Sequence, residues 1–180
     1  MSENTPDPAS ETKAIGKTMA LIAWIIGMLL ATQFFGAWEE KQINPNRSPE
    51  SYADQNGQHN TVLKRNRAGH YLTHGKINAV PVTFLLDTGA TDVVIPAAMA
   101  ARLGLPRLGK NRVQTANGEI DVYGTVIESL EFGNISLRAV RAAINPNMGP
   151  DEEILLGMSA LKQVDFRQEN GELILKQYRP

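Results

Sequence analysis

Length, composition and charge set the first limits on this chain. It has 180 residues, a net charge of −1, 42% hydrophobic and 21% charged residues, and no cysteine. That length suits one domain plus an extension, and the balanced charge excludes a broadly basic surface for nucleic acid. Aromatic residues make up only 6%, so no base-stacking nucleic-acid partner is expected. The lack of cysteine excludes disulfides, thiolate nucleophiles and Cys-ligated metals.

The N-terminal part predicts a membrane anchor. Residues 1–17 are polar, contain two prolines and are expected to form a short tail. Residues 18–38 carry no charge, and as a helix they would span about 30 Å, the thickness of the hydrocarbon core of a bilayer. They therefore predict one transmembrane helix. A cleaved signal peptide and a buried soluble helix are the alternatives. Cleavage of a signal peptide requires a small residue at position −3 of the cleavage site, where this chain has the bulky Phe35. A buried soluble helix would be amphipathic, whereas this segment is apolar all around.

The flanks of the apolar segment indicate its orientation only weakly. Lys and Arg are nearly balanced on its two sides, so the positive-inside rule decides little. A short tail before a single span favours an N-terminus on the inside. We expect a single-pass protein of the inner (cell) membrane, with its C-terminal domain periplasmic or otherwise extracytoplasmic. Residues 39–61 are polar, contain prolines and predict a flexible linker to a domain over residues 62–180.

Beyond residue 62 the pattern favours an all-β domain. Short apolar segments alternate with turn residues such as Asn-Gly and Gly-Asn, which is typical of β-hairpins. Two short helices are expected, after Pro96 and after Gly157. The sum is a small, mostly antiparallel barrel or sandwich. The predicted hairpins pair 70–77 with 80–86, 126–132 with 135–144, and 164–167 with 172–176, and the predicted helices are 97–103 and 158–163.

The informative motif is FLLDTGATDVVIP at residues 84–96. An apolar strand would deliver the Asp87 carboxylate to the end of a buried sheet, and Gly89 would allow a sharp turn that brings its N–H to that carboxylate. The Thr88 hydroxyl would be free to bond across a symmetric partner. This order favours aspartic-protease chemistry. The simpler interpretation is a strand-ending turn, because Asp and Gly both favour turns.

A second element strengthens the first. Residues 154–161, ILLGMSAL, are an apolar strand, a glycine and a short helix. With this pair of motifs the chain resembles the retropepsin-like (retroviral-type) aspartic proteases, and in particular a bacterial branch with an N-terminal membrane anchor. The resemblance covers residue 62 to the C-terminus and includes GHYLTHGKI, ARLGL, TANGE and VRAAI.

The resemblance implies a small closed β barrel and a role for each matching residue. Asp87 matches the catalytic aspartate, Thr88 the residue whose hydroxyl reaches across the dimer, and Gly89 the glycine that positions the turn. Three residues match the active-site support, and four match the flap that covers the substrate. The support residues are Ala90, Leu156 and Gly157, and the flap residues are Thr115, Ala116, Asn117 and Gly118.

One Asp-Thr-Gly makes half an active site. A homodimer would bring two copies of Asp87 together on a two-fold axis. Two carboxylates so close share a proton, so that one acts as a base on water and the other as an acid toward the peptide carbonyl. The expected activity is that of a membrane-anchored aspartic endopeptidase acting on polypeptides, without metal or cofactor.

Two departures from the family pattern leave an alternative open. The family usually places an Asp two residues after the first Gly and an Arg after the second, and these pair. Here the positions hold Thr91 and Met158. The alternative is a catalytically silent β module for dimerisation or peptide binding.

Overall fold

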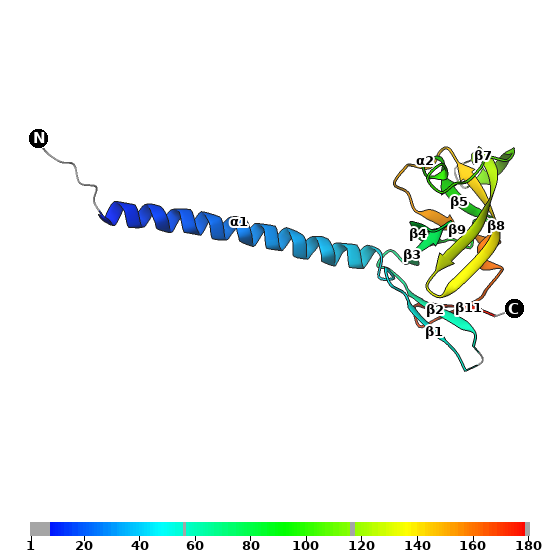
Figure 1. The fold of residues 1–180 in the computed structure, drawn as a ribbon, viewed down its shortest axis with the longest axis horizontal. Helices are drawn as coiled ribbons and strands as arrows, with labels where there is room; N and C mark the ends of the chain where they lie inside the picture. Colours follow the sequence, from blue (N-terminus) through cyan, green and yellow to red (C-terminus); the bar gives the residue numbers. More distant parts are fainter. Residues whose placement is uncertain (1–7, 56, 116–117, 179–180) are drawn as a thin grey trace, which may run out of the picture. The chain divides into compact units, whose positions relative to one another are not determined.

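The computed structural model describes residues 8–55, 57–115 and 118–178. The chain divides into two compact units, Met1–Lys41 and Gln42–Pro180. Helix α1 (Pro8–Ile43) supplies the first unit, and the second is built almost entirely of strands (Figure 1). The all-β prediction for the C-terminal domain is confirmed.

Helix α1 is longer than the predicted span. It begins at Pro8, inside the expected tail, and continues past residue 38 to Ile43. The extension at its end follows from good helix formers after Trp38, and Pro45 then prevents further helix. Among the described residues, Lys17–Ile43 is the one helical stretch long and apolar enough to cross a membrane. Its apolar side chains are exposed in the isolated chain, so they do not form part of a soluble core.

The segment 39–61 differs from the expected linker. It contains the end of α1, strand β1 (Glu50–Ala53) and the start of strand β2 (His59–Lys64). The physical reason is long-range pairing, since β2 forms hydrogen bonds with a strand close to the C-terminus. A polar segment gives little local sign of such a partner. The ordered C-terminal unit therefore begins at Gln42.

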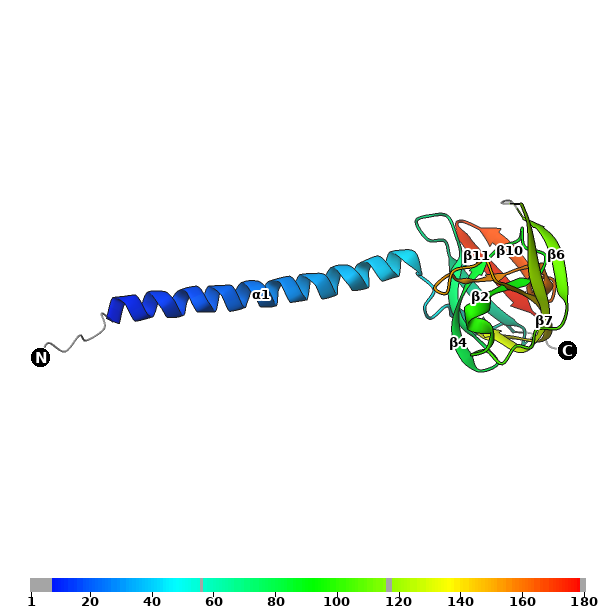
Figure 2. The same ribbon diagram turned by 90° about the horizontal axis from the view of Figure 1, so that it is seen from above.

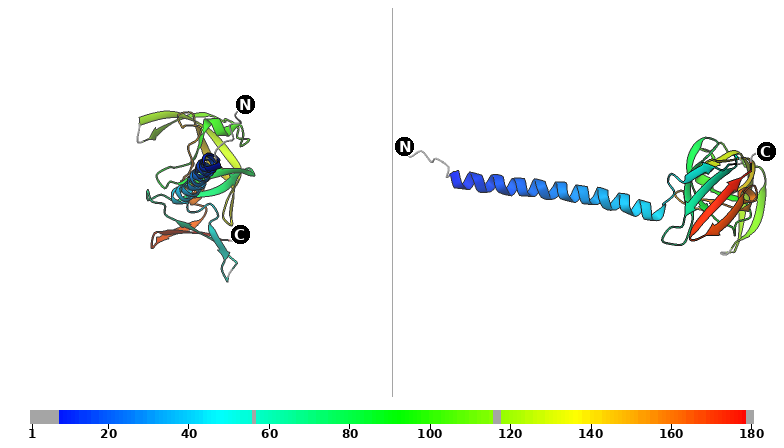
Figure 3. Two further views of the ribbon diagram at one scale, coloured as in Figure 1. Left: turned by 90° about the vertical axis from the view of Figure 1, so that its left-hand side faces the viewer. Right: turned by 90° about the horizontal axis from the view of Figure 1, so that it is seen from below.

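Four strands form a terminal sheet in the order β1-β2-β11-β10. All its pairings are antiparallel. Strands β10 (Asp165–Glu169) and β11 (Glu172–Gln177) are the predicted last hairpin, and Figures 2 and 3 show them beside β2. One face of β11 is buried through Leu173 and Leu175.

A larger sheet carries the Asp-Thr-Gly motif. Its order is β3-β4-β9-β5-β8-β7-β6, and β3 pairs a second time with β7, so the sheet curls back on itself. The closed barrel stays a prediction, because a single residue pair, Val94 with Leu155, joins β5 to β9. The strands are β3 (Leu72–Ile77), β4 (Val80–Leu86), β5 (Val93–Pro96), β6 (Lys110–Thr115), β7 (Gly118–Phe132), β8 (Ile135–Asn145) and β9 (Ile154–Leu156).

The predicted hairpins around Asn78-Ala79 and Gly133-Asn134 are confirmed. In the first turn even Ala79 adopts a positive φ of 66°, next to Asn78 at 48°. This two-residue turn matches the twist of its strands at some conformational cost to Ala79. The two predicted helices are present but shorter, as α2 (Ala97–Ala100) and α3 (Met158–Leu161).

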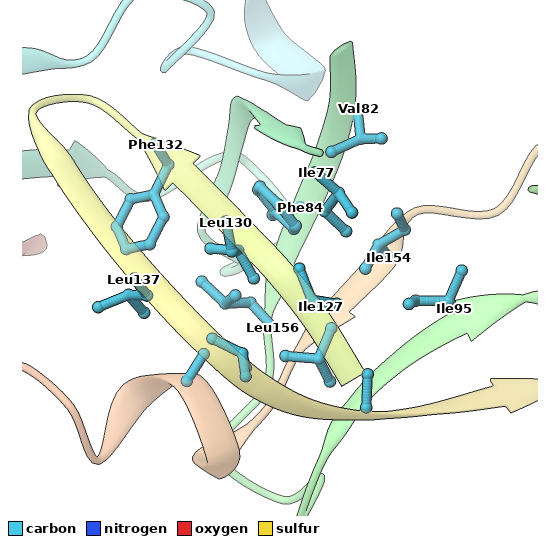
Figure 4. Close-up of a cluster of buried hydrophobic side chains, with 14 of the residues drawn as sticks. Ile77, Val82, Phe84, Ile95, Ile127, Leu130, Phe132, Leu137, Ile154 and Leu156 are labelled. Atoms are coloured by element: carbon cyan, nitrogen blue, oxygen red, sulfur yellow. The ribbon is translucent and has the colours of Figure 1, made fainter. Parts of the chain in front are cut away.

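The core lies inside the curled sheet (Figure 4). Phe84 and Phe132 meet edge to face, with ring centroids 6.3 Å apart, which is a favoured aromatic geometry. Phe84 from β4 and Leu156 from β9 are fully buried. These strands flank the Asp-Thr-Gly motif, so the packed core fixes the position of the loop that follows β4.

Candidate active site

Asp87 is placed by the parallel pair of β4 and β9. Leu86, the last residue of β4, lies opposite Leu156 of β9. The main-chain N–H of Asp87 then donates to the carbonyl oxygen of Leu156, at 3.2 Å. Because Leu156 is fully buried, the point at which the chain leaves the sheet is fixed. Leu156 thus contacts Asp87 directly through the backbone, and its supporting role stays a prediction.

The Asp87 carboxylate is held by its own loop. The N–H of Gly89 donates to Oδ1 of Asp87 at 2.8 Å, and the N–H of Ala90 donates to the Asp87 carbonyl oxygen at 3.3 Å. A Cβ on residue 89 would lie 3.1 Å from Asp87 Oδ1, so a larger residue would crowd the carboxylate. Asp87 itself is half-buried, whereas Thr88 and Gly89 are exposed.

The second glycine motif, residues 154–161, forms hydrogen bonds with the far end of the same loop. The N–H of Met158 donates to the carbonyl oxygen of Ala90 at 2.8 Å, and the N–H of Ser159 donates to that of Thr91 at 2.9 Å. Gly157 is buried beneath these bonds. The two motifs recognised in the sequence are therefore in direct contact, although they lie far apart along the chain.

A groove of about 420 Å³ runs between the Asp87 loop and the hairpin of β6 and β7. The loop contributes Asp87, Gly89 and Ala90, and the hairpin contributes Val113, Thr115 and Ile120. A mostly apolar groove with a carboxylate on its wall has the general composition of a ligand-binding site. A second cavity of about 410 Å³ lies over the terminal sheet, around Tyr52 and Ile174, and includes none of the Asp-Thr-Gly residues.

Ion pairs connect the two strands of the β6–β7 hairpin. Lys110 Nζ lies 2.8 Å from Asp121 Oδ2, and Arg112 Nε lies 3.5 Å from Asp121 Oδ1. The hydrogen bond from Lys110 lowers the pKa of the Asp121 carboxyl below its usual value, and the pKa of Lys110 is raised by the same bond. These groups are exposed, so they order the hairpin more than they add to global stability.

The predicted site residues separate into four groups. Asp87, Gly89, Ala90 and Thr115 line the groove, while Leu156 and Gly157 lie against the backbone of the Asp87 loop. Thr88 and Gly118 do not line the groove. Ala116 and Asn117 lie outside the described residues.

Sequence reasoning missed a polar cluster beside the groove, formed by Asp92, Arg141 and Ser159. Asp92 Oδ1 accepts hydrogen bonds from Nε and an Nη of Arg141, at 3.0 and 2.8 Å. The Ser159 hydroxyl joins β5 to β8. The one available signal was that Asp92 and Ser159 directly follow Thr91 and Met158, where the family pattern is broken.

Comparisons with known proteins bear on the family and the fold of the chain. Residues 73–163, half of the chain, match the family described as gag-polyprotein putative aspartyl protease. A retropepsin-like aspartic protease from Rickettsia conorii has a similar structure, with a TM-score of 0.56 and 27% identity over 71% of this chain and 96% of its own.

Two curated relatives are uncharacterized proteins. One, from Sinorhizobium sp., is encoded in the cobV 5′ region and is 29% identical over 64% of this chain and 50% of its own length. The other, from Rickettsia prowazekii, is 30% identical over 63% of this chain and 50% of its own length. The chain thus spans about half the length of the curated relatives it matches. From its motifs, its loop geometry and the matched residues, the chain belongs to the gag-polyprotein putative aspartyl protease family and is retropepsin-like.

Proposed function

We propose that the chain is a membrane-anchored aspartic endopeptidase that works as a homodimer. The observation that carries the proposal is the position of Asp87, whose carboxylate is oriented by the Gly89 N–H and lies on the wall of the groove beneath the β6–β7 hairpin. The groove is otherwise lined mainly by small and aliphatic side chains such as Val94, Val122 and Leu155. Such a surface suits an extended polypeptide with apolar side chains.

The chemistry requires two chains. Each supplies one Asp87, and the two carboxyls would share a proton because two charges so close are costly. The charged carboxylate takes a proton from water, which attacks the peptide carbonyl carbon, while the neutral carboxyl gives its proton to the carbonyl oxygen. The exposure of Thr88 and Gly89 in the single chain supports a partner covering this surface.

We further propose that α1 anchors the enzyme in the inner membrane, as in the bacterial branch that the sequence resembles. Large side chains on α1 are exposed, including Trp24 at 70% and Phe34 at 68%. A continuous exposed apolar surface of this kind requires an apolar environment. The orientation that we propose has the C-terminal unit outside the cytoplasm. Protease added to intact spheroplasts should then digest the C-terminal unit, and digestion confined to lysed cells would reverse this orientation.

The test of activity is cleavage of an unfolded protein by the full chain in detergent, at acidic pH. Asp87→Asn keeps the shape of the side chain but cannot form the one-proton pair, so cleavage should be lost while the circular dichroism stays folded. Asp151→Asn is the matched control, because Asp151 is exposed and outside the groove. Pepstatin should inhibit the wild-type enzyme. Cleavage that survives in purified Asp87→Asn and resists pepstatin would refute the proposal, and a wild-type chain that never cleaves would favour the silent module.

A further inference from the structure

The Ser159 side chain is a junction between three segments that surround the groove. Its hydroxyl accepts a hydrogen bond from the N–H of Val93 at 2.9 Å and donates to the carbonyl oxygen of Arg141 at 2.6 Å. Val93 is the first residue of β5, and Arg141 is on β8. The same hydroxyl thus connects the end of the Asp87 loop to the neighbouring strand.

The backbone of Ser159 holds the loop at a second point. Its N–H donates to the carbonyl oxygen of Thr91 at 2.9 Å. Ser159 therefore binds the residues on both sides of Asp92, through its backbone on one side and its hydroxyl on the other. Between these two bonds the path of residues 91–93 is fixed by one residue of α3.

Asp92, held in this way, is also fixed through its side chain. Two guanidinium nitrogens of Arg141 bond to its Oδ1, at 3.0 and 2.8 Å. Arg141 is the residue whose carbonyl oxygen accepts the Ser159 hydroxyl. The bridge from the Val93 N–H through the Ser159 hydroxyl to the Arg141 carbonyl oxygen, and the ion pair of Asp92 with Arg141, thus both join residues 92–93 to β8. Asp92 lines the groove together with Asp87, and its side chain is 30% exposed whereas that of Arg141 is 70% exposed.

This cluster occupies the place where the chain departs from the family pattern. Thr91 is exposed and Met158 packs against the hydrophobic core. Both side chains are uncharged, so neither supplies a charge to the base of the loop. One residue further along each motif, Asp92 and Ser159 make the polar connections instead. A loop with Gly89 exposed at its centre needs such restraint, since a displacement of about 1 Å at a catalytic group can reduce the rate by about a hundredfold.

We propose that Ser159 is a positioning residue for Asp87, and that the ion pair of Asp92 with Arg141 restrains the same loop. This inference rests on the proposed peptidase function. Ser159 does not touch the reacting atoms; it acts by keeping the loop that carries Asp87 at a constant distance from the groove wall on β8. Its loss should therefore slow the chemical step more than it weakens substrate binding.

The experiment compares Ser159→Ala, Ser159→Thr and the control Ser129→Ala in the full chain. Ser129 is on β7, and its hydroxyl donates to the Glu131 side chain on the same strand at 3.2 Å. Ser159→Ala should lower kcat about tenfold or more, with KM within about twofold. Ser159→Thr, which keeps a hydroxyl, should retain kcat, and Ser129→Ala should match the wild type. Affinity for pepstatin should fall in parallel with kcat, since a transition-state analogue reports the same geometry.

The Asp92–Arg141 pair gives an independent arm that does not depend on Ser159→Ala folding. Asp92→Asn, Arg141→Gln and the double variant should lower kcat by a similar factor each, because all three break one interaction. Additive losses, or a Ser159→Ala enzyme with unchanged kcat and pepstatin affinity, would overturn the positioning role. If wild type cleaves and Asp87→Asn does not, these results refute the inference alone. If Asp87→Asn still cleaves, the proposed function fails, and the inference fails with it.

Discussion

Gly157 lies directly against the carbonyl oxygen of Ala90, so close that a Cβ on residue 157 would be 2.7 Å from that oxygen. The contact joins the second glycine motif to the Asp-Thr-Gly loop, and the adjoining Met158 N–H bonds to the same oxygen. Glycine is required here by close packing of two backbones. Its φ is not in the left-handed region.

Gly157→Ala should accordingly destabilise the domain. The added methyl meets backbone atoms that cannot move aside, and overpacking of this kind costs about 1–3 kcal/mol. Denaturant unfolding of the full chain in detergent measures the loss. Gly109→Ala is the matched control, because a Cβ there meets nothing within 4 Å, and it should change the free energy of unfolding by less than about 0.5 kcal/mol. Equal stability of the two variants would contradict the packing argument.

Asn46 has a comparable role where the chain enters the C-terminal unit. Its side-chain amide donates to the carbonyl oxygens of Lys64 at 2.8 Å and Leu72 at 2.7 Å, and its Oδ1 accepts the N–H of Lys64 at 2.6 Å. The residue is 2% exposed. Asn46→Ala should therefore lower the free energy of unfolding by about 2–3 kcal/mol, because buried backbone groups lose their partners. The exposed Asn147→Ala serves as control, and the same loss in both variants would refute the prediction.

The ion pair between Lys110 and Asp121 predicts how the β6–β7 hairpin responds to pH. The folded pKa of Asp121 is below 3.8 and that of Lys110 above 10.5. The stabilisation of the hairpin by the Asp121 carboxylate is therefore present above pH 3.8 and is lost as the pH falls through the lowered pKa. The stabilisation by the Lys110 ammonium group is present below pH 10.5 and is lost as the pH rises through the raised pKa. Both charges persist throughout the range between, which includes the acidic pH at which the Asp87 pair is expected to work.

Hydrogen exchange of the hairpin amides tests this expectation. Between about pH 5 and 9, exchange corrected for intrinsic rates should be faster in Asp121→Asn than in the wild type, and the difference should disappear well below the ordinary carboxyl pKa. Glu128→Gln, an exposed change on β7, controls for lost charge. A difference that persists at the lowest pH would mean that the pair is not its cause.

The parts of this molecule that could be predicted are those with a local signal. Asp87, Gly89 and Gly157 were predicted because their chemistry and packing need particular residues in consecutive positions. The hairpin at Asn78-Ala79 followed from turn residues between apolar runs. Strand β2 was missed because it pairs with β11 near the C-terminus, and β1 was missed with it because, among the described strands, β1 pairs only with β2. Strand β6 was missed because its order comes from pairing with β7, and five of its six residues are polar.

The polar cluster of Asp92, Arg141 and Ser159 could not be predicted for a different reason. A single serine hydroxyl has no sequence signature, and Arg141 comes from a strand that meets β5 only in the folded sheet. The family pattern shows that charges are missing at Thr91 and Met158, but it does not show which residues replace them. That information is contained in the strand register, where Val93 pairs with Ala142 and so brings Arg141 beside Asp92.

Self-association provides the remaining prediction, and it concerns Thr88. The residue is exposed in the single chain, and its hydroxyl makes no hydrogen bond within the described part of the chain. If two chains meet at the Asp87 loops, each Thr88 hydroxyl gains a partner, and two such bonds at about 1 kcal/mol each change the dimer dissociation constant about tenfold to thirtyfold. Thr88→Ala should shift the concentration at which specific activity is half-maximal upward by that factor. The limiting kcat should stay near that of the wild type, because Asp87 is intact.

Thr88→Ser keeps the hydroxyl and is the matched control for that shift. Sedimentation of the three proteins in detergent gives the dissociation constants independently of activity, and the two measurements should agree. In liposomes at high surface density, the Thr88→Ala variant should recover wild-type activity, because confinement by α1 raises the effective concentration of the chains. A variant that stays inactive at saturating density would assign Thr88 to the chemical step. The activity of the wild type could also stay strictly proportional to protein concentration down to nanomolar concentrations. That result would indicate either a dimer too tight for this hydroxyl to matter or a site that is complete in one chain. Sedimentation distinguishes the two by mass: a nanomolar dimer retains the two-chain mechanism, whereas an active monomer ends it.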